Sequence, residues 1–210
     1  MTPTRVVHEA DAIAWLQQNE LPRDAAIVTS LPNVDEFQHR DLDRWRHWFR
    51  DTAALILQKT PPASAAVFFQ TDIQYDGVWI DKSQLVQQAA ASTGTPMIWH
   101  KVVLRGPPGT TTYSRPGFAH LLCFAPSVRN EKHNATPDVL PQLGEMDWPR
   151  AMGLDVATTA IRWLRDHAAA KTIVAPFCGT GTALTAANQL GLHAIGIERS
   201  TSRAARASRQ

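Results

Sequence analysis

Apolar runs alternate along most of the chain with segments in which apolar residues recur at helical spacing. This alternation is typical of a protein in which strands and helices follow one another. Apolar runs predict seven strands, near residues 5–9, 25–30, 65–73, 97–104, 120–124, 172–176 and 194–197. Helical spacing predicts helices at residues 11–16, 41–58, 81–91, 155–169 and 183–190. The expected architecture is α/β, with a seven-stranded, largely parallel sheet wrapped by helices.

One pair of predicted strands breaks the alternation, because no helix separates residues 97–104 from residues 120–124. The stretch between them, residues 106–117, is rich in Gly, Pro and Thr and predicts a loop. We therefore expect these two strands to form an antiparallel pair at one edge of the sheet. Residues 127–150 are polar and contain prolines, which also predicts a loop. No linker or internal repeat divides the sequence, so residues 1–210 are expected to form a single domain.

The most informative motif lies near the end of the chain, where an apolar run stops at Pro176. Two glycines follow, Gly179 and Gly181, and then a helix pattern that Gly191 closes. The next predicted strand runs into an acid, Glu198. A strand, a Gly-rich turn, a helix, a strand and an acid outline a nucleotide-binding half-unit. The glycines would let a ligand approach the backbone closely, and the acid could accept both hydroxyls of a ribose.

Two expected features of phosphate-binding loops are absent from this motif. A dinucleotide-binding turn has a third glycine three residues after the second, and that position is Leu184. A phosphate-binding loop has Gly-Lys-Ser/Thr, and no lysine follows Gly181. A nucleoside ligand without phosphates fits the turn better, and S-adenosylmethionine is the common one. The turn alone leaves open a second interpretation, an ordinary tight connection in an α/β protein.

Composition narrows the class of protein only slightly. The chain is 44% hydrophobic and 19% charged, with a formal net charge of +2, which is too small to demand a polyanionic partner. No apolar run has transmembrane length and no signal peptide is recognised, so we expect no membrane association. The two cysteines, Cys123 and Cys178, favour a reducing, cytoplasmic location over a disulfide framework. The eight histidines show no metal-ligand spacing with Cys or Asp, so no metal is predicted.

Five motifs in order resemble those of the beta-type amino methyltransferases, permuted class I S-adenosylmethionine enzymes that modify exocyclic amines of bases. They lie at residues 8–13, 28–33, 98–101, 120–124 and 175–182. The second contains Ser-Leu-Pro-Asn at residues 30–33, where the family has a catalytic Asp/Asn/Ser-Pro-Pro-aromatic tetrapeptide. The last reads Ala-Pro-Phe-Cys-Gly-Thr-Gly-Thr, against Asp-Pro-Phe-x-Gly-x-Gly-Thr in the family. The similarity covers nearly the whole chain and implies a Rossmann-like methyltransferase domain with permuted motif order.

The resemblance implies a cofactor, S-adenosylmethionine, and residues that hold it. Asp11 is expected at the adenine, with helix capping as its alternative role, and Glu198 at the ribose, with a solvated strand end as the alternative. The cofactor-binding set that the resemblance implies is Asp11, Ala12, Pro176, Phe177, Gly179, Gly181, Thr182 and Glu198. One departure concerns this set, since the acid of the family's late motif, which helps bind the methionine end, is Ala175 here.

The resemblance also implies a catalytic turn formed by Ser30, Leu31, Pro32 and Asn33. Methyl transfer from a sulfonium requires the amine to lie in line with the S–CH₃ bond, so positioning is the main task. Ser30 Oγ and the Leu31 carbonyl are the candidate acceptors for an amine N–H, and Pro32 would make the turn rigid. Asn33 replaces the family's aromatic residue, so a flipped base loses a stacking partner, normally worth ~1–3 kcal/mol. Asn33 would instead read a base edge.

The predicted substrate contacts are Asp35, Trp99, Lys101, Tyr113 and Arg115. Asp35 is the alternative acceptor for the amine, and Trp99 with Lys101 has the alternative of a core and edge position.

The family's target-recognition insert is missing, since only residues 126–150 occupy its place. Duplex DNA recognition with base flipping needs surface for both tasks. The leading expectation is therefore N-methylation of a base in RNA, in tRNA or rRNA, with recognition aided by a protein partner or a homodimer. The alternatives are a DNA adenine-N6 or cytosine-N4 methyltransferase and a degenerate methyltransferase-fold binding module.

Overall fold

The computed structural model describes residues 2–37, 40–113, 115–146, 148 and 150–209. In this part of the chain, eight strands form one sheet in the order β1-β10-β9-β2-β3-β7-β6-β8, and two more form a separate hairpin, β4-β5. Within the eight-stranded sheet, neighbouring strands are parallel except where β7 pairs with β3 and with β6, and the strands of the hairpin are antiparallel. The strands are β1 (Arg5–Glu9), β2 (Ala25–Thr29), β3 (Ala66–Gln70), β4 (Ile73–Tyr75), β5 (Val78–Ile80), β6 (Met97–Leu104), β7 (Phe118–Phe124), β8 (Val139–Leu140), β9 (Thr172–Pro176) and β10 (His193–Glu198).

The α/β architecture and the mostly parallel sheet are confirmed, and four details of the prediction are wrong. The sheet has eight strands among the described residues rather than seven, because Val139 and Leu140 add β8 beside β6. The antiparallel pair β6-β7 therefore does not lie at the edge. The predicted strand at 65–73 is interrupted, since β3 ends at Gln70 and Ile73 opens the β4-β5 hairpin. The predicted loop 127–150 contains β8 and a short 3₁₀ turn, η2 (Lys132–Asn134).

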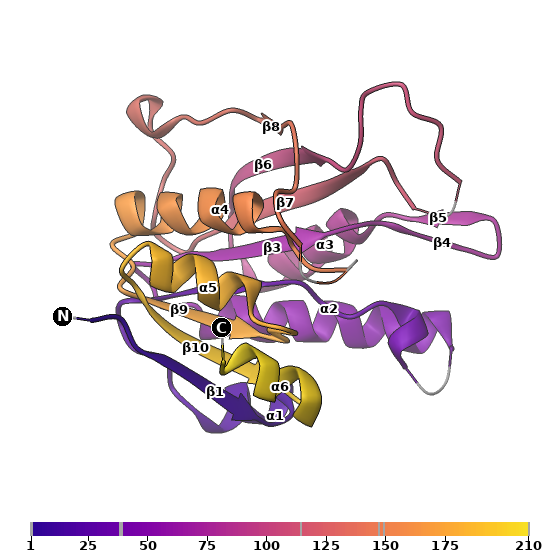
Figure 1. Ribbon diagram of the computed structural model, residues 1–210. Helices are drawn as coiled ribbons and strands as arrows, with labels where there is room; N and C mark the ends of the chain where they lie inside the picture. The colour runs from indigo at the N-terminus through magenta and orange to yellow at the C-terminus, as the bar shows by residue number, and fades with distance from the viewer. Residues whose placement is uncertain (1, 38–39, 114, 147, 149, 210) are drawn as a thin grey trace.

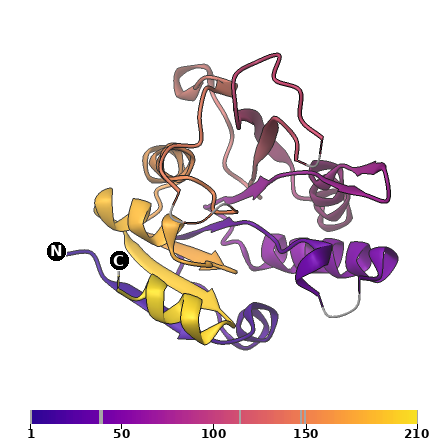
Figure 2. The same cartoon turned by 45° about the vertical axis from the view of Figure 1, so that its right-hand side comes forward.

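The helices cover both faces of the sheet. They are α1 (Ala12–Gln18), α2 (Leu42–Lys59), α3 (Lys82–Thr93), α4 (Leu154–His167), α5 (Thr182–Gln189) and α6 (Thr201–Ala207). Apolar residues of α4 and α5 pack on one face of the sheet, and those of α2 and α3 pack on the other, which forms two buried cores. Figures 1 and 2 show α4 and α5 on the side opposite α2, with α6 beside α5. No helix among the described residues is long and apolar enough to cross a membrane.

The sheet topology fixes where a ligand can bind. The chain leaves β9 through α5 toward β10, and it leaves β2 through α2 toward β3, on the other side. In open α/β sheets, ligands bind beyond the carboxyl ends of the strands where the connections part in this way. The two strands are also tied at this point, because the Thr29 hydroxyl donates to the Pro176 carbonyl at 2.7 Å. The candidate site is therefore expected beyond the ends of β2 and β9.

Candidate active site

A cleft of about 530 Å³ lies at this position, which is a size typical of sites for small ligands. Its walls come from the segments that follow β2, β3, β9 and β10, together with the start of α1. The cleft brings together most of the residues that the sequence predicted for two separate tasks. Of those predictions, it is lined by Asp11, Ala12, Ser30, Leu31, Pro32, Asn33, Asp35, Arg115, Phe177, Gly179, Thr182 and Glu198.

The turn after β9 has an unusual backbone. Phe177 has a φ of 58°, a strained conformation that a bulky residue rarely adopts, and Gly179 has a φ of 57°. A Cβ atom added at Gly179 would meet nothing within 4 Å, so the backbone here faces open space in the cleft. Burial raises the pKa of the neighbouring Cys178 thiol to about 12, so it is protonated at neutral pH. The turn thus offers an open cradle of backbone and no nucleophile.

Glu198 completes this cradle from the end of β10. Its side chain is buried, and its two oxygens accept the backbone N–H groups of Gly179, at 3.0 Å, and Ser200, at 2.9 Å. These bonds fix the carboxylate against the glycine turn. Each carboxylate oxygen can accept more than one hydrogen bond, so both can still receive a hydroxyl. The geometry fits the predicted ribose acceptor.

Asp11 reaches the same cleft from the opposite end of the chain. Its backbone position follows β1, which pairs with β10 so that Glu9 lies beside Glu198. One Asp11 oxygen accepts the Ala14 N–H at 2.9 Å and so caps α1, while the other has no partner among the described residues. The predicted alternative, a helix cap, is therefore present, and it leaves an acceptor available in the cleft.

Three residues of the late motif depart from the contacts expected with a cofactor. Pro176 and Gly181 do not line the cleft. Gly181 has a φ of 101° and starts α5, and a Cβ atom there would lie 3.1 Å from Ala207, so glycine lets α5 and α6 approach closely. Ala175 lines the cleft with only a methyl group where the resembling family has an acid.

The predicted catalytic turn forms the facing wall. Ser30, directly after β2, is half-buried, and its hydroxyl has no partner among the described residues, which leaves it available to a ligand. Pro32 is fixed through its carbonyl, which accepts the Trp45 Nε1–H of α2 at 3.1 Å. The Leu31 carbonyl and the Asn33 side chain, in contrast, are both engaged by a residue that sequence reasoning missed, Lys82.

Lys82 is the first residue of α3, and it is fully buried at 2% exposure. Its Nζ donates to the Leu31 carbonyl at 3.1 Å and to Asn33 Oδ1 at 2.8 Å. It also lies 5.3 Å from the centre of the Phe49 ring. Burial lowers the pKa of Lys82 to about 7, although nearby carboxylates, Glu36 first, oppose this change. A lysine at the start of a predicted helix gives no sign in the sequence that it will be buried.

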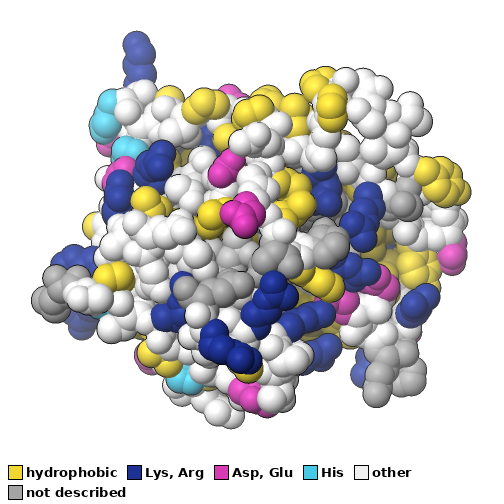
Figure 3. Space-filling model, in the orientation of Figure 1, with side chains coloured by type: hydrophobic (Ala, Val, Ile, Leu, Met, Phe, Trp, Pro, Cys, Tyr) yellow, Lys and Arg dark blue, Asp and Glu magenta, His cyan; other side chains and the backbone are white. Residues whose placement is uncertain are grey.

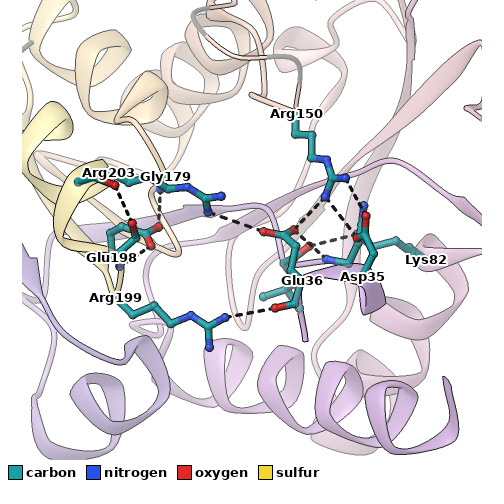
Figure 4. Close-up of polar contacts among 12 residues, drawn as sticks. Asp35, Glu36, Lys82, Arg150, Gly179, Glu198, Arg199 and Arg203 are labelled. Carbon is teal, nitrogen blue, oxygen red and sulfur yellow. Dashed lines mark hydrogen bonds and ion pairs between the residues drawn. The ribbon is translucent and has the colours of Figure 1, made fainter. Parts of the chain in front are cut away.

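Charged residues bridge the two walls of the cleft, as Figure 4 shows. Arg150 binds Asp35 at 2.7 Å, and this hydrogen bond raises the pKa of the guanidinium. From the other side, Arg203 lies 3.7 Å from a Glu36 oxygen, and Arg199 donates to the Glu36 carbonyl at 3.5 Å. The turn after β2 is therefore held between α6 and the segment before α4.

Comparison with known proteins identifies structures that share the fold of this chain. No protein-family model and no curated protein sequence matches the chain. Among solved structures, TTHA0409 of Thermus thermophilus, a candidate DNA modification methylase, is similar over 97% of this chain and 92% of its own, with 17% identity and a TM-score of 0.74. PvuII DNA methyltransferase, which is cytosine-N4-specific, is similar over 99% and 86%, with 14% identity and a TM-score of 0.79. M1.HpyAVI in complex with SAM is similar over 97% and 98%, with 18% identity and a TM-score of 0.62.

The chain has the class I methyltransferase fold. TTHA0409 has also been solved in complex with S-adenosyl-L-methionine, with a TM-score of 0.74 to this chain. The expected amino-methyltransferase architecture is thus confirmed as a fold.

Arginines form the outer rim of the cleft in this methyltransferase fold. Figure 3 shows Lys and Arg side chains over α6 and between α6 and the β4-β5 hairpin. The arginines that line the cleft are Arg40, Arg105, Arg115, Arg150, Arg199 and Arg203. Burial, together with the like charge of Arg115, lowers the pKa of Arg105, so the two cations are placed where an anion would relieve their repulsion.

The other predicted substrate residues lie elsewhere in the methyltransferase fold. Trp99 is buried in the core against Trp163, with ring centres 5.5 Å apart. Lys101 is buried on the same strand and donates to two carbonyls of the segment before β8. Neither lines the cleft, so their assignment as substrate contacts is corrected to core positions, which was the alternative. Tyr113 is 86% exposed and also lies outside the lining.

One buried polar cluster flanks the cleft behind the catalytic turn. Asp72 and His120 are joined at 3.1 Å, and His120 contacts His100 at 2.9 Å. Asp72 also accepts the Lys82 backbone N–H at 2.8 Å and the Trp79 Nε1–H at 3.0 Å. N–H donors therefore occupy both of its oxygens, and the cluster holds the β4-β5 hairpin and α3 against β7. The absence of a metal stays a prediction.

Proposed function

We propose that the protein is an S-adenosylmethionine-dependent methyltransferase that acts on an exocyclic amine of a nucleobase in nucleic acid, with DNA favoured over RNA. One observation carries the proposal: a single cleft joins the Glu198 cradle after β9 and β10 to the Ser30 turn after β2. A methyl donor and a methyl acceptor need such adjacent sites. The fold that the chain shares with known methyltransferases supports the assignment of these two parts to a methyl donor and a methyl acceptor.

The residues present fit the cofactor. The open space at Gly179 leaves room for a ligand against the backbone, and Glu198 would accept the ribose hydroxyls. Asp11 offers its free oxygen and Ala12 an apolar surface for the adenine. The cofactor would supply a methyl group on a sulfonium, which needs no activation of the leaving group. The protein is left with the task of orientation.

The facing turn suits an amine acceptor. The exocyclic amine of a base is a weak nucleophile because its lone pair is conjugated with the ring. Ser30 Oγ, which has no partner among the described residues, would accept one amine N–H and hold the nitrogen toward the methyl group. Pro32, anchored through Trp45, would keep the turn rigid during transfer. Hydrogen bonding and positioning, without a covalent intermediate, are sufficient for this chemistry.

The preference for DNA over RNA as the substrate reverses the expectation from the sequence. RNA was favoured because a recognition insert is missing, but the similar structures named for a substrate are a DNA methyltransferase and a candidate DNA modification methylase. Nothing in the structure favours tRNA or rRNA. The arginine rim suits the phosphates of either polymer. A partner or a second copy that supplies sequence recognition remains part of the proposal.

Two measurements test it. Calorimetric titration with S-adenosylmethionine should show binding; no binding at millimolar cofactor would contradict the cradle and the enzyme together. Transfer of labelled methyl to genomic DNA, total tRNA and rRNA should then label DNA most strongly. Labelling confined to RNA would reverse the substrate order. Cofactor binding without transfer to any of the three would favour a binding module, for which Ala175 in place of an acid is the supporting observation.

A further inference from the structure

The buried amine of Lys82 controls the two acceptors at the centre of the catalytic turn. Its hydrogen bonds to the Leu31 carbonyl and to Asn33 Oδ1, at 3.1 and 2.8 Å, join the start of α3 to the segment after β2. The Asn33 backbone N–H is held separately by Glu36 at 3.1 Å. The geometry of the turn is therefore set by Lys82, whose Nζ has no other hydrogen-bond acceptor among the described residues.

These contacts determine what Asn33 can offer to a ligand. Lys82 donates to the Leu31 carbonyl and to Asn33 Oδ1, and even a neutral amine keeps the two N–H groups that these bonds use, so the amide oxygen of Asn33 faces Lys82 and the amide nitrogen faces away. The two hydrogens on that nitrogen have no acceptor among the described residues, and Asn33 lines the cleft. A base whose amine stands beside a ring nitrogen, as in adenine N6 or cytosine N4, presents an acceptor that such a donor can bind.

We propose that Lys82 is a positioning residue for methyl transfer, which fixes the Leu31 carbonyl and turns the Asn33 amide N–H groups toward the target base. The inference rests on the proposed function. Lys82 acts through the turn, whereas Ser30 and Asn33 would touch the substrate.

The charge of Lys82 matters for the same reaction. During transfer, the amine lone pair forms the new N–C bond, the C–S electron pair stays on sulfur, and the nitrogen carries positive charge until its proton leaves to water. An ammonium behind the turn opposes this charge, and a neutral amine does not. The charged groups facing Lys82 are Glu36 and Asp35, which directly follow the catalytic turn, Asp72 before β4, and Arg150 before α4. Because burial lowers the pKa of Lys82 to about 7, its charge changes near neutral pH.

Two variants separate this role from simple packing. Lys82→Met keeps the length of the side chain but removes its donors and charge. It should lower kcat at least tenfold, leave the Kd for S-adenosylmethionine within about twofold, and abolish the acid limb of the kcat–pH profile. Asn33→Asp places an anion against Nζ, so the acid limb should move upward by about one pH unit. Should Lys82→Met not fold, Asn33→Asp carries the test.

A readout independent of turnover is the NMR titration of the Lys82 side chain in the free protein. Its ¹³Cε resonance should titrate near pH 7 in the wild type and at higher pH in Asn33→Asp. A wild-type kcat or an unchanged acid limb in Lys82→Met, or a titration above pH 9 in the wild type, would overturn the inference while the methyltransferase stands. If the wild type transfers no methyl group to any nucleic acid, the proposed function fails, and the positioning role fails with it.

Discussion

Glu198 provides a test of the cofactor cradle at the scale of one residue. Glu198→Gln replaces one carboxylate oxygen by an NH₂ group, so either the Gly179 or the Ser200 N–H loses its acceptor. Hydrogen bonds to a charged group are worth about 1.5–3 kcal/mol, so the Kd for S-adenosylmethionine should rise at least tenfold in calorimetry. Glu9→Gln is the matched control, because Glu9 is exposed and lies beside Glu198 in the sheet register. Equal losses in both variants would contradict the cradle.

The sequence predicts which residues line the cleft where an apolar strand ends at a polar side chain. Glu198 and Ser30 both follow apolar runs, so their position at the carboxyl end of the sheet could be anticipated. The burial of Lys82 could not be anticipated, because it depends on the turn after β2 folding over the start of α3. In the sequence, Asn33 and Lys82 are 49 residues apart. The motif over residues 98–101 led to a wrong assignment of Trp99 and Lys101 as substrate contacts. The alternation of side chains along a strand does not show which face of the sheet meets the cleft.

At the scale of elements, the loop between β6 and β7 brings two arginines to the rim of the cleft. Arg115 lies on this loop, is exposed, and lines the cleft with Arg105. Arg115→Ala should weaken nucleic-acid binding and reduce the slope of log K against log salt by about one, because one phosphate contact is lost. Fluorescence anisotropy with a labelled duplex at several salt concentrations measures this slope.

Arg23→Ala is the control for that measurement. Arg23 is exposed and precedes β2 at its amino end, so it lies at the edge of the sheet away from the cleft. It should leave both the affinity and the salt slope unchanged. A similar change in the two variants would mean that nucleic acid is attracted by net charge and not by the rim.

The hairpin and the eighth strand show two reasons why elements were missed. The β4-β5 hairpin turns at Asp76-Gly77, where both residues have positive φ, and Asp-Gly is a known hairpin signal that the long apolar run at 65–73 obscured. Strand β8 has only two residues, and it forms because Val139 and Leu140 pair with β6. Pairing between segments so far apart has no local signature in polar sequence, so β8 could not be predicted from the sequence.

At the scale of the whole molecule, the order of elements in space differs from their order in the chain. The two ends of the sequence meet, because β1 pairs with β10 and so places Asp11 near Glu198. The resemblance implied this closure, and the sheet order shows it as a fold. The cleft therefore depends on contacts between segments that are distant in the sequence, and it forms only when the whole sheet is folded.

Lys82 makes that stability depend on pH in a direction that can be worked out. Its pKa is 10.5 in the unfolded chain and about 7 when folded. Below pH 7 both states hold the proton, and the full cost of burying a charge weakens the fold. Between pH 7 and 10.5 the unfolded state binds more protons than the folded state, so this cost decreases as pH rises. Above pH 10.5 it is gone.

The window for a measurement is bounded from above by Cys178. Burial raises the pKa of this thiol from 9.0 to about 12, so its contribution to stability is complete below pH 9 and is lost as pH rises toward 12. The difference in urea unfolding between the wild type and Lys82→Met over pH 7 to 9 therefore isolates Lys82, because Lys101, whose pKa burial also lowers, is present in both proteins. Over this range the free energy of unfolding of the wild type should rise relative to Lys82→Met by about 1 kcal/mol per pH unit.

Lys59→Met is the matched control for this slope, because Lys59 pairs at the surface with the exposed carboxylate of Glu20 at 2.8 Å. It should run parallel to the wild type from pH 7 to 9. If the free energy of unfolding of Lys82→Met also changes with pH as that of the wild type does, the buried amine keeps its proton throughout this range. A rise of the wild type relative to Lys82→Met would instead show that folding makes this amine neutral, since only the folded chain places Lys82 behind Leu31 and Asn33.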